Sequence, residues 1–437
     1  MTPFSRKPFR IKILHLLFFL VILSLFACSE SRIYDEKMAV HLVQKDEGYE
    51  IIRNGKPFTI RGVCGQTNLG LLQSIGGNTI RTYDTTNLGA VLDSAHAHNL
   101  AVIAGIYLPV STTHWLYGND SIADYYNTAI KKVIEQHKDH PALLMWCLGN
   151  ELIYYDFWDL SFAKTYNTFV ETIYETDGQH PVTTAIANFS DRAIVNFRLK
   201  IPEIDLFLFN TFGRLPKLEE DMEPYKLIWD GPFLVGEYGE NGPWESETTE
   251  WGAPLEMNSN EKAHRLAHDF NENLPNDNPR YLGGLAFYWG QRQEVTHTWF
   301  NFFSTDTMKS APVFSLAKLW GKPLAGNRPP EVKSFTINGT RQFNNFLFGP
   351  GTRQRASFHL SDPDNDSLYY SWELLPEDWY FQKAKKPQAV AGLLHDSHAS
   401  QIEFETPQKP GPYRLYAKAF DKHGNFAVAN LPFYVVR

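Results

Sequence analysis

The fold is decided by the stretch Leu143-Leu144-Met145-Trp146-Cys147-Leu148-Gly149-Asn150-Glu151. Its six leading apolar residues are too few to cross a membrane, and such a run is typical of a strand buried on both faces in a parallel sheet. The run then changes abruptly to Gly-Asn-Glu. In parallel barrels the functional side chains follow the carboxyl ends of the strands. Glu151 is therefore a candidate functional residue, with capping of the next helix as its plainer interpretation.

A second stretch repeats this design, with a short apolar strand that ends in an acid: Pro232-Phe233-Leu234-Val235-Gly236-Glu237-Tyr238-Gly239. Glu240 lies three positions after Glu237, past the expected strand end and in a loop. One strand ending in a carboxylate is ordinary, but two in the same chain indicate a shared purpose. We therefore treat Glu151 and Glu237 as a candidate pair.

Strand-like and helix-like segments alternate between residues 58 and 320. The apolar, strand-like segments are 58–65, 78–83, 100–108, 143–148, 182–187, 204–210, 233–236 and 282–289. Helical spacing occurs at 88–98, 122–137, 160–176, 261–273 and 311–320. Eight strands alternating with helices predict an α/β fold of the (β/α)8 TIM barrel type. A doubly wound open sheet is the alternative, but no Gly-x-Gly-x-x-Gly follows the first strand, so nucleotide binding has no support.

The regions on either side of these segments have a different character. Asn54-Gly55, between two apolar runs, predicts a tight hairpin turn before the first barrel strand. Asn327-Arg328-Pro329-Pro330 predicts a linker, and strand-like segments follow it at 332–337, 355–360, 368–374, 401–405, 413–419 and 427–436. Their alternation, clearest in 413–419, predicts strands with one buried and one wet face. We therefore predict the barrel at residues 42–322 and an all-β immunoglobulin-like sandwich at residues 328–437.

The N-terminus has the pattern of a targeting signal. A basic start precedes an apolar run that ends in Leu25-Phe26-Ala27-Cys28. Residues 1–27 resemble a bacterial lipoprotein signal peptide, in which the cysteine is lipidated and becomes the mature N-terminus. Acyl chains on Cys28 would anchor the protein to a membrane of the cell envelope, facing the periplasm or the exterior, with residues 28–41 as a tether. Simple secretion and an uncleaved anchor are the alternatives.

Composition and charge narrow the range of partners. The net charge is −8 and no Lys/Arg-rich run lies beyond the extreme N-terminus, so we expect no nucleic-acid partner. Aromatic residues make up 14% of the chain, a supply that suits a groove stacking against sugar rings. Cys64 and Cys147 lie in apolar runs, which indicates buried inert thiols and no disulfide framework. No His or Cys cluster has zinc-ligand spacing, and the acidic turn 362–366 is interpreted as a solvated turn, with a calcium site as the alternative. We therefore predict neither a metal site nor a cofactor.

In a barrel, Glu151 would end the fourth strand and Glu237 the seventh, so that the two carboxylates face each other across the mouth. Carboxylates so placed can act on a glycosidic bond, one protonating the leaving oxygen while the other attacks the anomeric carbon. A separation of about 5 to 5.5 Å would give a covalent intermediate and retained configuration. The two pKa values must then differ: surroundings raise that of the acid, and hydrogen-bond donors keep the nucleophile ionised.

Asn150-Glu151 after one apolar strand, and Glu237-Tyr238 after another 86 positions later, resemble the catalytic barrel of the retaining glycoside hydrolases of clan A, and most of all glycoside hydrolase family 2. The resemblance covers roughly residues 42 to 321 and includes the segments 54–63 and 78–81. It implies that Glu151 is the general acid/base and Glu237 the nucleophile. It also implies that Asn150 binds the sugar hydroxyl next to the anomeric carbon, that Arg81 keeps the nucleophile ionised, and that Trp289 floors the subsite of the reacting sugar. The plainer interpretations are a turn residue for Asn150, a barrel-mouth ion pair for Arg81 and core packing for Trp289.

The domain order differs from that of family 2, whose enzymes usually carry a sugar-binding sandwich and an immunoglobulin-like domain ahead of the barrel. Residues 80–84 and 102–107 also resemble β-1,3-glucanases and glucanosyltransferases of the same clan. The resemblance thus implies a retaining hydrolase of β-linked oligo- or polysaccharides, with a transglycosylase of that clan as the alternative. A non-catalytic barrel that binds surface glycan, and a purely structural surface protein, are the hypotheses from other classes.

Overall fold

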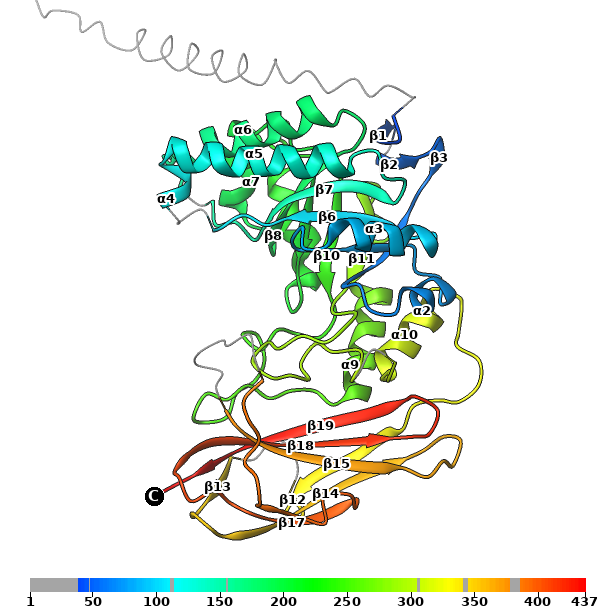
Figure 1. Cartoon of the computed structure of the whole chain (residues 1–437), viewed down its shortest axis with the longest axis vertical. Coiled ribbons are helices and arrows are strands. Elements are labelled where there is room, and N and C mark those ends of the chain that lie inside the picture. The colour runs from blue at the N-terminus through cyan, green and yellow to red at the C-terminus, as the bar shows by residue number, and fades with distance from the viewer. Residues whose placement is uncertain are drawn as a thin grey trace, which may run out of the picture.

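The computed structural model describes residues 38–46, 48–110, 114–154, 156–304, 307–340, 345–377 and 386–437. The predicted signal peptide and Cys28 lie outside these residues. Figure 1 shows a barrel surrounded by helices in the N-terminal part and layered sheets in the C-terminal part, with α9 (Ser259–His268) and α10 (Ala311–Leu319) between them. No helix of the described residues is both long and apolar enough to span a lipid bilayer.

Eight strands close into a barrel in the order β10-β11-β4-β5-β6-β7-β8-β9. Their bounds are β4 (Ile60–Cys64), β5 (Thr79–Arg81), β6 (Ala101–Ile106), β7 (Leu143–Asn150), β8 (Val182–Ala187), β9 (Leu206–Asn210), β10 (Phe233–Tyr238) and β11 (Tyr281–Ala286). Every neighbouring pair is parallel, and β11 closes the ring on β4. Each strand overlaps one of the predicted segments. The (β/α)8 barrel is therefore confirmed, and the open doubly wound sheet is wrong.

The barrel strands are apolar because both of their faces are covered. All six residues of β6, and every residue of β7 before Asn150, are buried. One face packs against the surrounding helices, and the other fills the barrel with residues such as Ile103, Met145 and Leu234. A continuous apolar run is what such a strand requires. The run ends where the chain reaches the barrel mouth, which is where the polar residues begin.

The helices that cover the barrel follow the predicted spacing. They include α3 (Leu88–Ala97), α5 (Asp120–His137) and α6 (Leu160–Thr176). Asp159 caps the start of α6 by accepting a hydrogen bond from the Phe162 N–H (3.2 Å). The predicted helix at 261–273 is divided: α9 ends at His268 and continues as a π turn, η3 (Asp269–Asn273). The prediction missed shorter helices: α2 (Leu69–Ser74), α4 (His114–Tyr117), α7 (Asp191–Lys200) and α8 (Leu218–Met222).

A small antiparallel sheet precedes the barrel. It consists of β1 (Val40–Lys45), β2 (Gly48–Arg53) and β3 (Lys56–Pro57). Asn54 (φ 50°) and Gly55 (φ 72°) connect the last two strands, and both have the positive φ values that a type I′ turn requires. The predicted tight turn is confirmed, and β1 adds a strand that was not predicted.

Two four-stranded sheets form the C-terminal part. One has the order β12-β14-β17-β16 and the other β13-β19-β18-β15. Their bounds are β12 (Glu331–Ile337), β13 (Phe346–Phe348), β14 (Arg353–Ser361), β15 (Tyr369–Pro376), β16 (Leu394–His395), β17 (Gln401–Glu405), β18 (Gly411–Phe420) and β19 (Phe426–Val435). Both sheets contribute to one core, which includes Phe358, Phe404, Leu415 and Leu431. The predicted strands are all present, and the short β13 and β16 were missed.

The other face of β18 and β19 contacts the barrel, so the wet face that alternation predicted is wrong for this sheet. Arg414 is 1% exposed, and its Nη2 donates to the Pro254 carbonyl (2.7 Å). Asn430 Nδ2 donates to Glu256 Oε2 (2.6 Å) in the loop after β10. Glu256 also pairs with the buried Lys262 of α9 (2.7 Å). Polar residues alternate along these strands because they bind the barrel loops, not because they meet water.

Candidate active site

Glu151 directly follows β7, and Glu237 is the penultimate residue of β10; β8 and β9 separate these two strands in the barrel. Polar side chains from β9 and β5 connect the two carboxylates. Asn210, the last residue of β9, donates from Nδ2 to Glu151 Oε1 (2.7 Å). Arg81, the last residue of β5, donates from Nη1 to Glu237 Oε1 (3.2 Å). The two glutamates that the sequence singled out therefore lie in one polar cluster at the carboxyl ends of the strands.

Arg81 is the centre of this cluster and is 1% exposed. Its Nη1 also donates to Asn210 Oδ1 (2.8 Å) and to the Gly236 carbonyl (3.1 Å), while Nη2 donates to Asn150 Oδ1 (2.7 Å). Gly236 allows this close approach, because a Cβ there would lie 2.8 Å from Asn210 Oδ1. The structure therefore brings three of the predicted residues, Arg81, Asn150 and Glu237, into direct contact.

Asn210 is absent from the predicted site although it contacts most of its members. It is 3% exposed, and its Nδ2 lies 3.1 Å from Asn150 Oδ1 as well as beside Glu151. Its position immediately after four apolar residues of β9 is the same signal that identified the glutamates. An uncharged amide at a strand end is also common in turns, so that signal was too weak to use.

Tyr83 is the second residue that the sequence did not identify. Its hydroxyl donates to Glu237 Oε1 (2.7 Å), and the Arg81 guanidinium lies 4.8 Å from its ring centroid. Arg81 was expected to keep Glu237 ionised, but burial outweighs the effect of both donors. Burial raises the pKa of Glu237 to about 7; Arg81 opposes this change, the charge of Glu151 adds to it, and the hydrogen bond from Tyr83 opposes it.

The backbone turns sharply at Glu151. Its φ of 52° lies in the left-handed region, and Gly149 two positions earlier has a φ of 78°. For a residue with a Cβ this conformation costs of order 1–3 kcal/mol, and such strain clusters at functional sites. The Glu151 N–H still donates to the Ala185 carbonyl of β8 (2.9 Å). The strained turn at the end of β7 thus directs the side chain of Glu151 to Asn210.

The side chain of Trp289 is not accessible to a sugar bound at the carboxylates. It is fully buried, and its indole packs edge-on against Phe302 and Phe303. The indole N–H donates to the Thr67 carbonyl. These contacts correspond to core packing, the plainer interpretation that the sequence left open, and they leave no ring face for a ligand.

Other groups at the mouth are exposed. Arg292, in the loop after β11, lies 5.8 Å from the Tyr83 ring centroid, and its Nε binds Glu294 Oε2 (2.5 Å). Its charge acts to lower the pKa of Glu237. Trp158 and Trp244, in the loops that follow the two glutamate strands, are 81% and 61% exposed. The rim thus offers a cation and two aromatic faces.

The thiols are buried, as predicted. Cys64 and Cys147 are free, and burial raises the pKa of the Cys64 thiol to about 12. Within the described part of the chain, carboxylates with metal-ligand spacing occur in the C-terminal loops and not at the barrel mouth: oxygens of Asp362, Asp366 and Asp421 lie within 4.8 Å of one another. At the barrel mouth, the carboxylate of Glu237 pairs with the buried guanidinium of Arg81 (3.2 Å).

Comparison with known proteins identifies the barrel type. The family described as "Glycosyl hydrolases family 2, TIM barrel domain" matches residues 68–245. The chain is 25% identical over 225 residues to β-glucuronidase of Mus musculus, a match that covers 43% of this chain and 32% of that protein. This chain thus spans about a third of the length of that relative. It spans about half the length of the solved structures described next.

Solved structures agree on the fold. Bifidobacterium dentium β-glucuronidase complexed with coumarin-3-O-glucuronide has a TM-score of 0.51 at 16% identity, covering 64% of this chain and 49% of that one. A family 2 β-galacturonidase of Eisenbergiella tayi, bound to galacturonate, has a TM-score of 0.50 at 14% identity, covering 66% and 55%. At these identities the likeness establishes the fold and nothing further.

Proposed function

The barrel of this chain is most like the catalytic barrel of glycoside hydrolase family 2, and on that premise we propose that the protein is a retaining glycoside hydrolase acting on β-linked glycans. One observation carries the proposal: Glu151 and Glu237, from two different strands, share a hydrogen-bonded cluster through Asn210 and Arg81. Two carboxylates at the mouth of a barrel are what double displacement at a glycosidic carbon requires.

In the first step the Glu237 carboxylate attacks the anomeric carbon while the bond to the leaving oxygen breaks. Glu151 gives its proton to that oxygen, which departs as an alcohol. In the second step Glu151 takes a proton from water, and the resulting hydroxide displaces Glu237 from the anomeric carbon. Because each step inverts the carbon, the product keeps the configuration of the substrate. Water is the only reagent consumed besides the substrate, and both acids are regenerated.

The surrounding residues support this chemistry. Arg81 and Tyr83 both donate to Glu237 Oε1 and stabilise its charge as the bond to the sugar breaks. Asn150 directs Oδ1 to Arg81, which leaves its Nδ2 as a donor for the sugar hydroxyl beside the anomeric carbon. The exposed faces of Trp158 and Trp244 suit sugars that extend beyond the reactive one.

We propose β-linked uronides as the first substrates to test. The relatives named above act on or bind glucuronides and galacturonate, and Arg292 supplies a cation at the rim beside Tyr83. Transglycosylation differs only in the acceptor, because a sugar hydroxyl would replace water in the second step. A non-catalytic binding barrel has no need of a buried carboxylate whose pKa is raised, together with a strained backbone at the other acid.

The test is an activity screen with aryl β-glycosides of neutral and acidic sugars, using wild type, Glu151→Gln, Glu237→Gln and an exposed control, Glu135→Gln on α5. We expect either active-site change to reduce kcat/KM by roughly 10²- to 10⁴-fold, and the control to leave it unaltered. A fluorosugar inactivator should label Glu237, and NMR of the first product should show the retained anomer. If both active-site variants keep wild-type rates on every substrate that the parent cleaves, the proposal is wrong.

We also propose that acylation of Cys28 anchors the protein at the cell envelope, with the barrel at residues 42–322 and an immunoglobulin-like sandwich at residues 328–437. The basic start and the apolar run before Cys28 support the anchor, and two facing sheets with a common core support the sandwich. Metabolic labelling with a fatty acid should tag the wild type and not Cys28→Ala. Labelling that persists in the variant would refute the anchor.

A further inference from the structure

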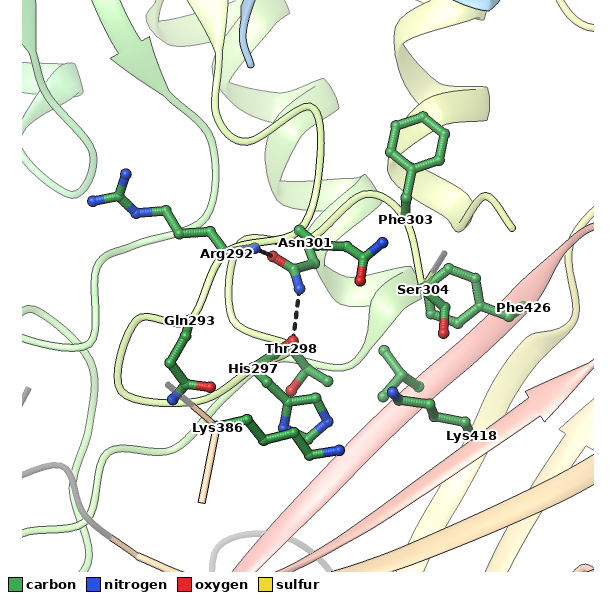
Figure 2. Close-up of a pocket in the computed structure, with 12 residues that line it drawn as sticks. Arg292, Gln293, His297, Thr298, Asn301, Phe303, Ser304, Lys386, Lys418 and Phe426 are labelled. Atoms are coloured by element: carbon green, nitrogen blue, oxygen red, sulfur yellow. Dashed lines mark hydrogen bonds between the residues drawn. The ribbon is translucent and has the colours of Figure 1, made fainter. Parts of the chain in front are cut away.

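A pocket of about 310 Å³ lies behind the loop that follows β11. On one side it is lined by that loop, including Gln293 and His297, and on the other by Lys418 of β18 and by residues of β19. Figure 2 shows these side chains around the cavity between the loop and the C-terminal sheet. The volume is at the small end of the range of roughly 300–1,000 Å³ typical of ligand sites. It therefore suits one small molecule.

Lys418 supplies a positive charge without a counter-ion. Among the described residues, none makes a hydrogen bond or ion pair with its Nζ, although the side chain is largely buried. Glu373, the acid with the largest effect on its pKa, is already bound by Lys386 (2.5 Å), which also lines the pocket. Burial lowers the pKa of Lys418, which is the cost of holding a charge out of water. An anion in the pocket would remove that cost.

Two buried atoms beside this lysine need a different kind of partner. Gln293 Oε1 and His297 Nδ1 have no hydrogen-bond partner among the described residues. His297 Nε2 lies 3.2 Å from Glu373 Oε2 without forming a hydrogen bond, so either ring nitrogen can carry the proton, and Nδ1 can accept or donate. Gln293 Oε1 requires a donor, which a simple carboxylate does not provide, and a hydroxyl group can satisfy His297 Nδ1 whether that nitrogen donates or accepts. Buried polar atoms of folded proteins normally have partners, either protein or water, and a ligand that replaces water here is best matched to these atoms if it carries hydroxyl groups.

We propose that this pocket is a binding site for a single hexuronic acid, distinct from the candidate active site. The carboxylate would bind Lys418, one ring hydroxyl would donate to Gln293 Oε1, and another would form a hydrogen bond with His297 Nδ1. A neutral hexose leaves the charge of Lys418 uncompensated, and acetate leaves Gln293 Oε1 without a donor. The assignment goes beyond the proposed glycosidase activity, because it holds whether or not the barrel cleaves glycosides.

The pocket also lies next to the rim of the active site. Asn301 braces the loop between them: its Oδ1 accepts from the Arg292 N–H (2.6 Å) and its Nδ2 donates to the His297 carbonyl (2.6 Å). Arg292 extends from the same loop towards Tyr83. The dashed bonds of Asn301 in Figure 2 mark this brace. A ligand on His297 therefore contacts the segment that positions Arg292.

The experiment is calorimetric titration of the full chain with sodium glucuronate, sodium galacturonate, glucose and sodium acetate. The variant is Lys418→Met, and Lys422→Met is the matched control, since it removes the same charge from an exposed lysine nearby. We expect one of the two hexuronates to bind, and Lys418→Met to weaken it roughly ten- to hundredfold, as loss of a charge-assisted hydrogen bond does. Lys422→Met should bind as the wild type does.

A second measurement identifies the site directly and does not require the variant to fold. Lysines of the wild type are labelled with an amine-reactive reagent and quantified by mass spectrometry, with and without hexuronate. We expect hexuronate to protect Lys418 and not Lys422; a ligand confined to the active site would protect neither. Equal protection by glucose or acetate, absence of any protection, or unchanged hexuronate affinity in Lys418→Met would overturn the assignment. Loss of glycosidase activity in either glutamate variant has no bearing on this result.

Discussion

Replacing Glu237 with glutamine should make the protein more stable, and by an amount that depends on pH. The carboxyl group has an ordinary pKa of 4.5 and, because it is buried, a pKa of about 7 in the folded protein. Between these two values the unfolded chain has lost the proton while the folded chain still holds it. Stability contributed by this group is therefore complete below 4.5 and falls as the pH rises towards 7. At roughly 1.4 kcal/mol per pKa unit, the loss is about 3 kcal/mol.

Glutamine resembles the protonated carboxyl group in shape and does not titrate. Glu237→Gln therefore avoids this loss, and its stability relative to the wild type should increase by about 3 kcal/mol between about pH 4 and about pH 8. Groups elsewhere titrate alike in both proteins and cancel in the comparison. The net value already includes Arg81 and Tyr83, whose interactions with the carboxylate lower its pKa.

Urea unfolding, followed by circular dichroism at several pH values, measures the difference. Glu135→Gln is the control, since it removes a carboxylate from the exposed face of α5 and should show no such trend. A constant gap between Glu237→Gln and the wild type would refute the argument, because burial would then not govern the ionisation of Glu237. A stability difference that grows as the pH falls would have the opposite pH dependence and would also refute the argument.

Three other predictions concern the same molecule. If Glu237 must be ionised to attack, kcat/KM of the wild type should fall about tenfold per pH unit below about pH 7. A pH–rate profile that is flat below pH 7 would exclude Glu237 as the nucleophile. Tyr83→Phe removes a donor that lowers the pKa of Glu237, so the acidic limb of the pH–rate profile should move to higher pH; an unmoved limb would contradict this role. Asn430→Ala removes a donor from the buried carboxylate of Glu256. Urea unfolding should show that the free energy of unfolding falls by about 2 kcal/mol. An unchanged value would show that this contact does not stabilise the packing of the sheet on the barrel.

The barrel was predictable because each strand is a short apolar run whose length and ends are set locally. Glu151 and Glu237 were predictable for the same reason, since a charge directly after such a run has one obvious place in the fold. Asn210 was not, although it ends β9 in the same way. Its role depends on the alignment of β9 with β10, where Glu237 pairs with Asn210, and a sequence does not reveal the register between parallel strands.

The failures at Trp289 and on β18 have a common cause. Phe287, Tyr288 and Trp289 follow a strand, and a sequence of three aromatic residues does not reveal which of them faces the mouth. In the structure Trp289 faces the core around Phe303. On β18, Arg414 looked like a residue in contact with water, but it is buried against the Pro254 carbonyl. In both cases the side chain's environment is made by a segment far away in the sequence.

Arg81 affects not only the charge of Glu237 but also the orientation of other side chains in the site. A guanidinium has only donors, so the Asn210 atom 2.8 Å from it must be the carbonyl oxygen Oδ1. The amide nitrogen then points to Glu151 and donates to its Oε1. With Oε1 accepting that bond, the proton that Glu151 gives to the leaving oxygen has to reside on Oε2. Arg81 therefore orients both acids, one directly and the other through Asn210. A change at Asn210 should consequently affect the proton donor, while a change at Tyr83 should affect the nucleophile, although neither residue is itself an acid.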